Sequence, residues 1–300
     1  MDRPPIDGAA IRADVTVTFC ARKPAHVLQP AASLCGDVIP AEIGFGRFID
    51  DMAHPLHENA PPLWARALRW PEATSHKHQR GRLAVVSGGL ANTGAARLAA
   101  QSGLRIGAGL VTLLCPPAAL MVAASSVTAV MTSSFASADD LVAQTERSSA
   151  IIIGPAAGIT DATRANVEAL GRAGRNLVLD ADALTVFAGQ SDHLNSILSP
   201  TAILTPHTGE FERLFPGLLA SSANKIDAVR TAAAHMRATV LLKGADTIIA
   251  APDGRATVNI HATPFLATAG SGDVLAGIIG GLLAQGVAPF DAARAAAWLH

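Results

Sequence analysis

The chain has 300 residues, of which 50% are hydrophobic and 4% aromatic, and it contains no tyrosine. This length suffices for one large or two ordinary domains, with a core built mainly from Ala, Val, Leu and Ile. The formal net charge is −1 and charged residues are spread along the chain, which excludes a basic surface for nucleic acid or an anionic membrane. We therefore expect a small-molecule partner, with no nucleic acid and no membrane.

The cysteines Cys20, Cys35 and Cys115 are widely spaced and form no Cys-x-x-Cys pair. Their odd number and spacing argue against a disulfide framework or a zinc site, so we expect free thiols in a reducing cytosol. The chain does not open with a basic segment followed by an apolar run, as a secretory signal does. These features predict a cytoplasmic protein.

Residues 1–60 differ in character from the rest of the chain. The stretch AIRADVTVTFCARKP predicts a strand and its exit loop, but segments containing Pro, His and Gly follow without a helix of useful length. These 60 residues alone lack the material for a core. Residues 53–75 have the proline content of a linker, with one short helix expected at residues 64–68.

A repeating pattern begins at residue 83: a short apolar run, a Gly-containing or polar motif, and then a longer Ala-rich stretch of helical character. Continuous apolar strands alternating with helices predict a mostly parallel α/β sheet with helices on both faces. Residues 247–251 and 256–260 flank Pro-Asp-Gly and predict a hairpin at the sheet margin. The predicted parallel strands are residues 83–87, 110–114, 150–153, 177–179, 202–205 and 240–242.

Most of these strands are followed by a loop with polar or glycine residues: GGLANTGAARLAA, GPAAG, DADAL, PHTGE and KGADT. Ligands of open parallel sheets bind beyond the carboxyl ends of the strands, so these loops are expected to line one rim. No G-x-x-x-x-G-K-[ST] motif is present, which excludes a Walker-type phosphate loop. The stretch GLRIGAG at residues 103–109 precedes a strand and is better explained by helix packing.

The motif GSGD at residues 270–273 opens an apolar helix. Asp273 could cap that helix, as acids near a first turn often do. Alternatively, the glycines strip side chains from the helix N-terminus so that an anion reaches its amides, and Asp273 faces the reacting group. In the second interpretation the amides of Gly270, Ser271 and Gly272 form an anion hole. Residues 274–288 are too short to span a bilayer and predict a buried helix.

Other polar residues at strand ends also leave two readings. Lys243 either extends its charge into solvent or grips the phosphates of a nucleotide. His207 is either a surface loop residue or a substrate contact. The side chains of Asp180 and Asp182 point to opposite sides if the strand continues, so one could cap the following helix while the other reaches the site. Glu210 also permits both a structural and a functional interpretation. The shared location of these residues carries more weight than any one of them.

Taken in order, the motifs TGAARLAAQSGLRIGAGLVTLLCP, IIIGPAAG, LVLDADALTVFAG, ILTPHTGEFERLFP, LLKGADTIIAAPDG and LATAGSGDVLAGIIGGLLAQG resemble the NAD(P)H-hydrate dehydratases. The resemblance implies a ribokinase-like fold for residues 77–300, with a C-terminal end shorter than usual. Residues 1–60 resemble the closing strands of a Rossmann-like NAD(P)H-hydrate epimerase domain, and residues 61–76 form a linker. The epimerase's substrate-binding segments are missing, so we expect no epimerase activity.

The resemblance implies repair of NADH or NADPH hydrated at the nicotinamide ring, by ADP-dependent or ATP-dependent dehydration with Mg²⁺ and no dedicated metal ligands. In the expected mechanism, Asp273 is the catalytic base that prepares the ring hydroxyl for phosphorylation, after which phosphate leaves. A homo-oligomer is also expected. The residues implied to contact the hydrated cofactor are Ala95, Gly158, His207 and Asp273. Those implied to bind the nucleotide are Lys243, Gly244, Ala245, Asp246, Thr247 and Gly272.

Two rival functions stay open. A ribokinase-like kinase acting on a small molecule such as a vitamin precursor would share GSGD and release a stable phosphoester. A non-catalytic nucleotide-binding relic is the second rival, although the retained Asp273 and Lys243 argue against it.

Overall fold

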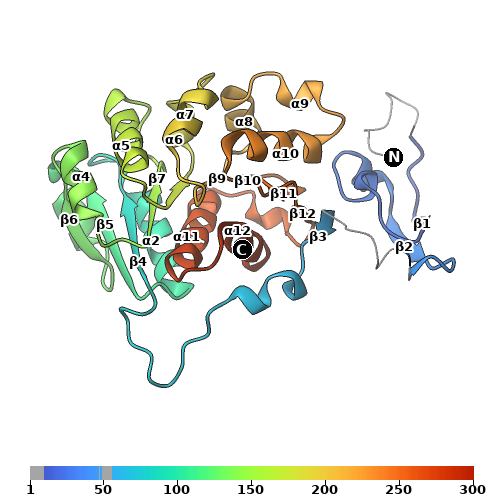
Figure 1. The fold of residues 1–300 in the computed structure, drawn as a ribbon, viewed down its shortest axis with the longest axis horizontal. Coiled ribbons are helices and arrows are strands. Elements are labelled where there is room, and N and C mark those ends of the chain that lie inside the picture. Colours follow the sequence, from blue (N-terminus) through green and yellow to red (C-terminus); the bar gives the residue numbers. More distant parts are fainter. Residues whose placement is uncertain (1–9, 47, 49–55) are drawn as a thin grey trace.

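The computed structural model describes residues 10–46, 48 and 56–300 (Figure 1). Parts of the expected N-terminal unit therefore lie outside the described residues. In the part of the chain that is described, β1 (Val15–Phe19) and β2 (Asp37–Ala41) form a small parallel sheet. The other described strands form a sheet of ten strands, which confirms the predicted α/β fold.

The large sheet is parallel except at one margin, where β10 (Thr239–Leu242), β11 (Thr247–Ala250) and β12 (Ala256–Asn259) pair antiparallel, as the hairpin prediction required. The predicted parallel strands are also confirmed. Two short strands of this sheet, β3 (Leu56–Glu58) and β6 (Met131–Ser134), were not predicted, because neither combines useful length with a continuous apolar run. In spatial order the strands are β3 (Leu56–Glu58), β12 (Ala256–Asn259), β11 (Thr247–Ala250), β10 (Thr239–Leu242), β9 (Ile203–Leu204), β8 (Leu177–Leu179), β7 (Ala150–Ile153), β4 (Arg82–Val86), β5 (Leu110–Cys115) and β6 (Met131–Ser134).

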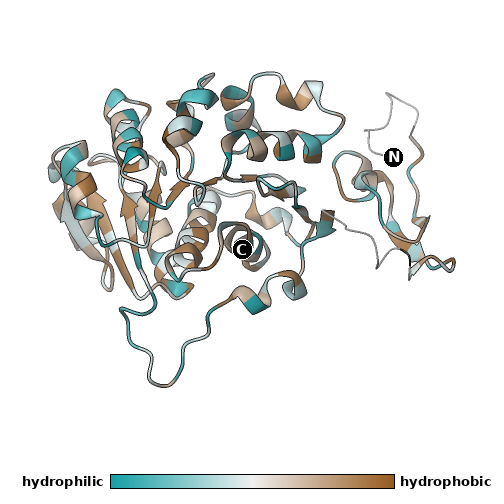
Figure 2. Ribbon diagram, in the orientation of Figure 1, coloured by the Kyte–Doolittle hydropathy of each residue, from teal (hydrophilic) through white to brown (hydrophobic). Residues whose placement is uncertain are grey.

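Alternate residues of each central strand enter opposite cores. In β4, Leu83 and Val85 pack on one face of the sheet, whereas Ala84 and Val86 pack on the other. Figure 2 shows the hydrophobic strands between helices whose outer surfaces carry hydrophilic residues. Helices α2 (Gly94–Arg105), α3 (Leu120–Ser125), α11 (Ser271–Ala284) and α12 (Pro289–Leu299) cover the first face. Helices α4 (Ala138–Gln144), α5 (Asp161–Arg172), α6 (Asp182–Thr185), α7 (Ser191–Ile197), α8 (Thr208–Leu214), α9 (Leu218–Ser221) and α10 (Lys225–Met236) cover the second.

The predicted buried helix is α11, and its glycines bring it against α2. A Cβ atom on Gly277 would lie 1.8 Å from Ser102 Oγ, and one on Gly281 would lie 2.7 Å from the Gly103 carbonyl oxygen. Gly103 thus serves helix packing, as the sequence predicted for that stretch. Among the described residues, no helix is both long and apolar enough to cross a membrane.

Residues 56–68 pack against the large sheet. Strand β3 pairs with β12, which puts residues 56–58 in that sheet, ahead of the boundary expected after residue 60. The helix expected at residues 64–68 is instead a pair of 3-10 turns, Pro61–Leu63 and Ala65–Ala67. Trp64 is 3% exposed, with its ring 5.8 Å from that of Trp298.

The small sheet lies beside β3 and β12 (Figure 1). Between β1 and β2 the chain makes two 3-10 turns, Pro24–His26 and Ala31–Leu34. An ion pair of 3.2 Å joins Arg22 Nη1 to Glu58 Oε2, and the Gln29 N–H donates to Asp246 Oδ2 over 2.8 Å. The N-terminal unit therefore contacts the large sheet at the end of β3 and in the loop after β10.

Candidate functional site

The loops that follow the strands are held together at the rim by close backbone contacts. A Cβ atom on Gly88 would lie 1.9 Å from the Ala156 carbonyl oxygen, and one on Gly154 would lie 1.7 Å from that of Asp180. The Gly158 N–H donates to Asp182 Oδ2 over 2.8 Å. Only glycine permits the first two approaches, which explains its recurrence in these motifs.

Lys243 lies at the centre of a buried charged cluster. Its backbone N–H donates to the Pro206 carbonyl over 2.8 Å and so continues the pairing of β9 with β10. Its Nζ lies 2.6 Å from Asp180 Oδ1 and 3.9 Å from Glu210 Oε2. Asp180 is 2% exposed and also accepts a 2.9 Å hydrogen bond from the Thr205 hydroxyl. The ammonium group is therefore paired at the rim, and the solvent-directed interpretation is wrong.

Asp273 stands half-buried in the first turn of α11, close to this cluster. Burial raises its pKa above the usual value, the negative charge of Asp180 raises it further, and Lys243 opposes both. Its side chain makes no hydrogen bond to a described residue, and no side-chain bond caps α11. Asp273 therefore forms no hydrogen-bonded cap, although it remains an acid in the first turn of the helix, where it complements the helix dipole.

The N-terminus of α11 presents free amides. Gly270 has φ of +86°, a left-handed conformation that favours glycine, and begins the helix. The N–H of Val274 donates to the Gly270 carbonyl over 3.0 Å, and that of Ser271 to the Thr268 carbonyl over a long 3.4 Å. The remaining amides of this turn, on Gly270, Gly272 and Asp273, donate to no described residue. Such a turn can hold an anion.

A cavity of about 770 Å³ lies between the loop after β10 and this helix terminus. Its lining includes most of the residues expected to bind nucleotide: Lys243, Gly244, Ala245, Thr247 and Gly272. A Cβ atom on Gly272 would lie 3.5 Å from Lys243 Nζ, so the two loops meet closely. Asp246 is absent from the lining, because its carboxylate is bonded to Lys225 and Gln29.

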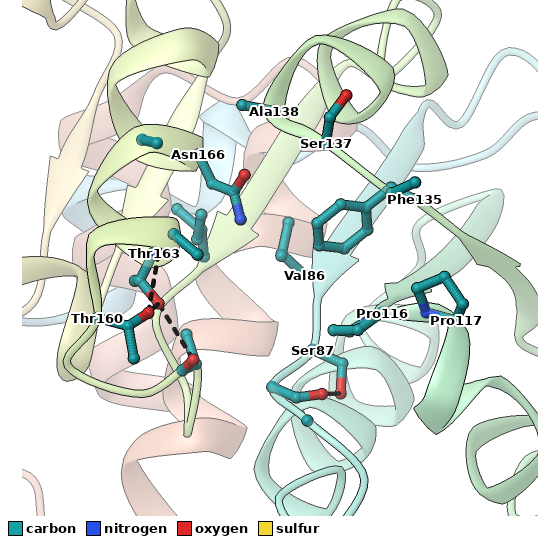
Figure 3. A pocket seen from close by; sticks show the side chains of 17 residues that line it. Val86, Ser87, Pro116, Pro117, Phe135, Ser137, Ala138, Thr160, Thr163 and Asn166 are labelled. Carbon is teal, nitrogen blue, oxygen red and sulfur yellow. Dashed lines mark hydrogen bonds between the residues drawn. The ribbon is translucent and has the colours of Figure 1, made fainter.

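A smaller cavity of about 300 Å³ opens between the loops that follow β4, β5, β6 and β7 (Figure 3). Its wall includes Ser87, Phe135 and Asn166, and the hydroxyl of Thr163 donates to the Ala157 carbonyl over 3.1 Å. Thr160 caps α5 by accepting from the Thr163 N–H. The sequence did not predict this cavity.

The other residues expected to touch the substrate also lie at the rim. Ala95 is half-buried in the first turn of α2, and Gly158 ends the loop after β7. His207 begins α8: its Nδ1 accepts hydrogen bonds from the Gly209 N–H at 2.9 Å and the Glu210 N–H at 3.3 Å. The sequence had not predicted this capping role, and half of the ring stays exposed.

The described residues contain no group of three or more His, Cys, Asp or Glu side chains arranged to hold a metal ion. A magnesium ion carried by nucleotide phosphates needs only one or two protein carboxylates. Asp180 and Glu210 are the carboxylates beside Lys243, and neither of them lines either cavity.

Sequence reasoning left several site residues without a role. Asp180 and Glu210 were noticed as acids at strand ends, but their pairing with Lys243 could not be read from the sequence. His26 and Gln29 were missed, although both line the larger cavity. Gln29 is separated from Asp246 by 217 residues, and no local pattern signals such a contact.

Comparison with known proteins gives a consistent result. A family model described as NAD(P)H-hydrate dehydratase matches residues 83–300. The bifunctional NAD(P)H-hydrate repair enzyme of Moorella thermoacetica is 39% identical over 98% of this chain and 58% of its own length. That of Salinibacter ruber is 35% identical over 96% of this chain and 56% of its own length. The chain thus spans somewhat more than half the length of these relatives.

Among solved structures, an ADP/ATP-dependent NAD(P)H-hydrate dehydratase from Bacillus subtilis, crystallised with ATP/Mg²⁺, is similar with a TM-score of 0.70. It is 27% identical, and the match covers 83% of this chain and 88% of that one. A ribokinase-like superfamily protein from Enterococcus faecalis, 24% identical, gives a TM-score of 0.71 over 83% of this chain and 87% of its own. These matches confirm the ribokinase-like fold.

Proposed function

Since this chain belongs to the NAD(P)H-hydrate dehydratase family, we propose that it dehydrates hydrated NADH or NADPH at the expense of an adenine nucleotide. The observation that carries this proposal is that Lys243, Gly272 and the free amides of α11 meet at one large cavity, with Asp273 next to Gly272 and electrostatically coupled to Lys243 but outside the cavity lining. A base, a cation and unpartnered N–H groups at one point are what phosphoryl transfer needs.

The nucleotide is proposed to occupy the larger cavity, with its phosphates between Lys243 and the amide of Gly272. ADP is the expected form, with ATP as the alternative. The hydrated nicotinamide ring is proposed to lie on the other side of Asp273, within reach of Ala95, Gly158 and His207. The smaller cavity, whose wall includes Ala157 and Thr160, is proposed to receive another part of the dinucleotide (Figure 3).

In the proposed reaction, the Asp273 carboxylate takes the proton of the ring hydroxyl as its oxygen attacks the terminal phosphorus. The bond from that phosphorus to the rest of the nucleotide breaks, and AMP leaves when ADP is the donor. The lone pair of the ring nitrogen then expels phosphate from the carbon that carried the hydroxyl. The departing phosphate takes a proton from the next ring carbon, which restores the dihydropyridine. The amides of Gly270 and Gly272 hold charge on the phosphoryl oxygens during transfer.

A magnesium ion bound to the nucleotide would supply positive charge to its phosphates. Asp180 and Glu210 are the carboxylates proposed to orient it. Both also hold the Lys243 ammonium in place, so they serve the site with or without contact to the metal.

The N-terminal unit is proposed to correspond to the closing strands of an epimerase-like domain. Support comes from the bifunctional relatives, whose similarity extends over almost the whole of this chain. A further support is the exposure of Val15, Val17 and Phe19, apolar residues along β1 that a larger sheet would cover.

The decisive experiment incubates the protein with hydrated NADH, ADP and Mg²⁺ and follows the absorbance of reduced nicotinamide. We expect the absorbance to return, with AMP and phosphate formed in equal amounts. A stable phosphoester without recovery of absorbance would identify a small-molecule kinase instead. A chain that binds nucleotide but neither restores the absorbance nor forms a phosphoester would be the non-catalytic nucleotide-binding relic.

A further inference from the structure

Two segments that are distant in the sequence line the larger cavity together. One is the loop that follows β10, and the other is residues 23–32 of the N-terminal unit, here named the N-terminal loop. His26, Val27, Gln29 and Ala32 of this loop belong to the cavity wall. The N-terminal unit is therefore part of the nucleotide cavity and not only a neighbour of the large domain.

Asp246 fastens the N-terminal loop to this wall. Its carboxylate accepts hydrogen bonds from the Gln29 N–H at 2.8 Å and from Lys225 Nζ at 2.9 and 3.1 Å. Asp246 is 5% exposed and does not line the cavity. A carboxylate with its oxygens already bonded to cationic and amide donors has little capacity left for a nucleotide, and an anchoring role accounts for all of its contacts.

His26 is the member of the loop with an unsatisfied group. It is 7% exposed, its Nδ1 accepts the Lys23 N–H at 3.0 Å, and its Nε2 has no partner among the described residues. Burial, and then the nearby charges of Lys23 and Arg22, lower the pKa of this ring below the usual value. The neutral ring that accepts at Nδ1 carries its hydrogen on Nε2, so His26, a residue of the cavity wall, holds a buried N–H donor that has no acceptor among the described residues.

We propose that the N-terminal loop completes the nucleotide site, with the His26 Nε2–H donating to the purine base and Asp246 positioning the loop without touching the nucleotide. This inference rests on the proposed function. A base is favoured over a phosphate because the ring is uncharged. The side chains of Val27, Ile260 and Leu266 line the same cavity and suit a flat apolar surface, whereas Lys243 and Gly272 suit the phosphates.

Calorimetric titration of the full chain with ADP and with inorganic pyrophosphate, which lacks the base, separates these roles. We expect His26→Ala to weaken ADP binding by about tenfold, which corresponds to one lost hydrogen bond, and to leave pyrophosphate binding unchanged. His26→Gln, whose amide can both accept and donate, should restore most of the ADP affinity. Asp37→Asn is the matched control, because Asp37 is exposed on β2 of the same unit and lies outside the cavity wall.

A second measurement needs no variant. Hydrogen exchange of the amides in residues 24–32 of the unmodified chain should slow when ADP is added and stay unchanged with pyrophosphate. The role of the loop would be refuted if the unmodified chain and His26→Ala bound ADP equally well, or if ADP did not change hydrogen exchange in the loop. Either result would leave the proposed dehydration intact. Absence of any ADP binding to the unmodified chain would overturn both proposals.

Discussion

At the scale of single residues, the chemistry of the site depends on the pKa of Asp273, on which neighbouring groups act in opposite directions. Burial and the carboxylate of Asp180 disfavour its charged form, whereas Lys243 favours it. A carboxyl group in this position keeps its proton to higher pH than a solvent-exposed one, and it is a stronger base once ionised. Because the pKa of Asp273 is higher in the folded chain than in the unfolded chain, the free energy of unfolding decreases as the pH rises between these two pKa values.

Asp273→Asn tests the proposed base directly. The amide has nearly the same shape but cannot accept the hydroxyl proton, so we expect turnover to fall by at least about 10²-fold while nucleotide affinity is retained. Steady-state kinetics together with calorimetry measure both quantities. Asp253→Asn, in the exposed hairpin turn, is the control that should leave turnover unchanged. Near-normal turnover in Asp273→Asn would remove the residue from the chemistry.

Lys243→Met tests the electrostatic link between two site residues. Because Lys243 lowers the pKa of Asp273, its removal should move the acidic limb of the pH profile of kcat to higher pH and also weaken nucleotide binding. The profile should be recorded at saturating nucleotide. Lys225→Met is the matched control, since Lys225 pairs with Asp246 and should leave the limb in place. An unmoved limb in Lys243→Met would contradict the assigned coupling.

At the scale of elements, the position of the reacting groups depends on how closely α11 approaches α2. Gly277 and Gly281 allow the two backbones to come together, and this contact supports the helix turn that carries Asp273. The apolar glycine-rich composition of α11 is therefore a requirement of packing. Its N-terminal turn adds the free amides, so one element serves both the core and the site.

Gly277→Ala should disrupt this contact. The new methyl group would overlap Ser102 Oγ and the Ala99 carbonyl oxygen, so the helices have to separate, at a cost of about 1–3 kcal/mol in the free energy of unfolding. Gly94→Ala in α2 is the control, since its Cβ atom would have no neighbour nearer than 3.9 Å. Urea unfolding measures the free energy of unfolding of both variants. Equal values for Gly277→Ala and Gly94→Ala would show that the close contact between α11 and α2 at Gly277 does not contribute to stability.

At the scale of the whole molecule, the larger cavity joins parts of the chain that fold into different units. The loop after β10, the start of α11 and the N-terminal loop each provide part of its wall. A ligand that binds all of them ties the N-terminal unit to the large sheet. Nucleotide binding should therefore stabilise the complete molecule as well as the site.

ADP should raise the free energy of unfolding by about 2.7 kcal/mol when present at one hundred times its Kd. A thermal melt with and without ADP and Mg²⁺ measures this as an increase of several degrees in Tm. Lys243→Ala should lose most of the increase at the same ADP concentration. A melting curve of the unmodified chain that does not respond to ADP would argue against the nucleotide site.

Sequence and structure differ most clearly in how they treat residues at strand ends. The sequence predicted that Lys243, His207 and Asp273 share one rim, and the structure places all three there. It could not tell whether Asp180 or Asp182 faces Lys243, because the direction of a side chain beyond a strand depends on how the turn closes. The structure shows Asp180 pairing with Lys243 and Asp182 holding Gly158.

The sequence by itself determined the parallel sheet, the hairpin at its margin and the location of the motifs at strand ends. Apolar runs and glycine motifs indicate strands, turns and buried segments through local preferences, which can be recognised in the sequence alone. Only the tertiary structure decided that Asp246 anchors the N-terminal loop and that His26 enters the cavity wall. Those contacts join residues more than 200 positions apart. Their existence depends on the path of the folded chain, which local patterns do not specify.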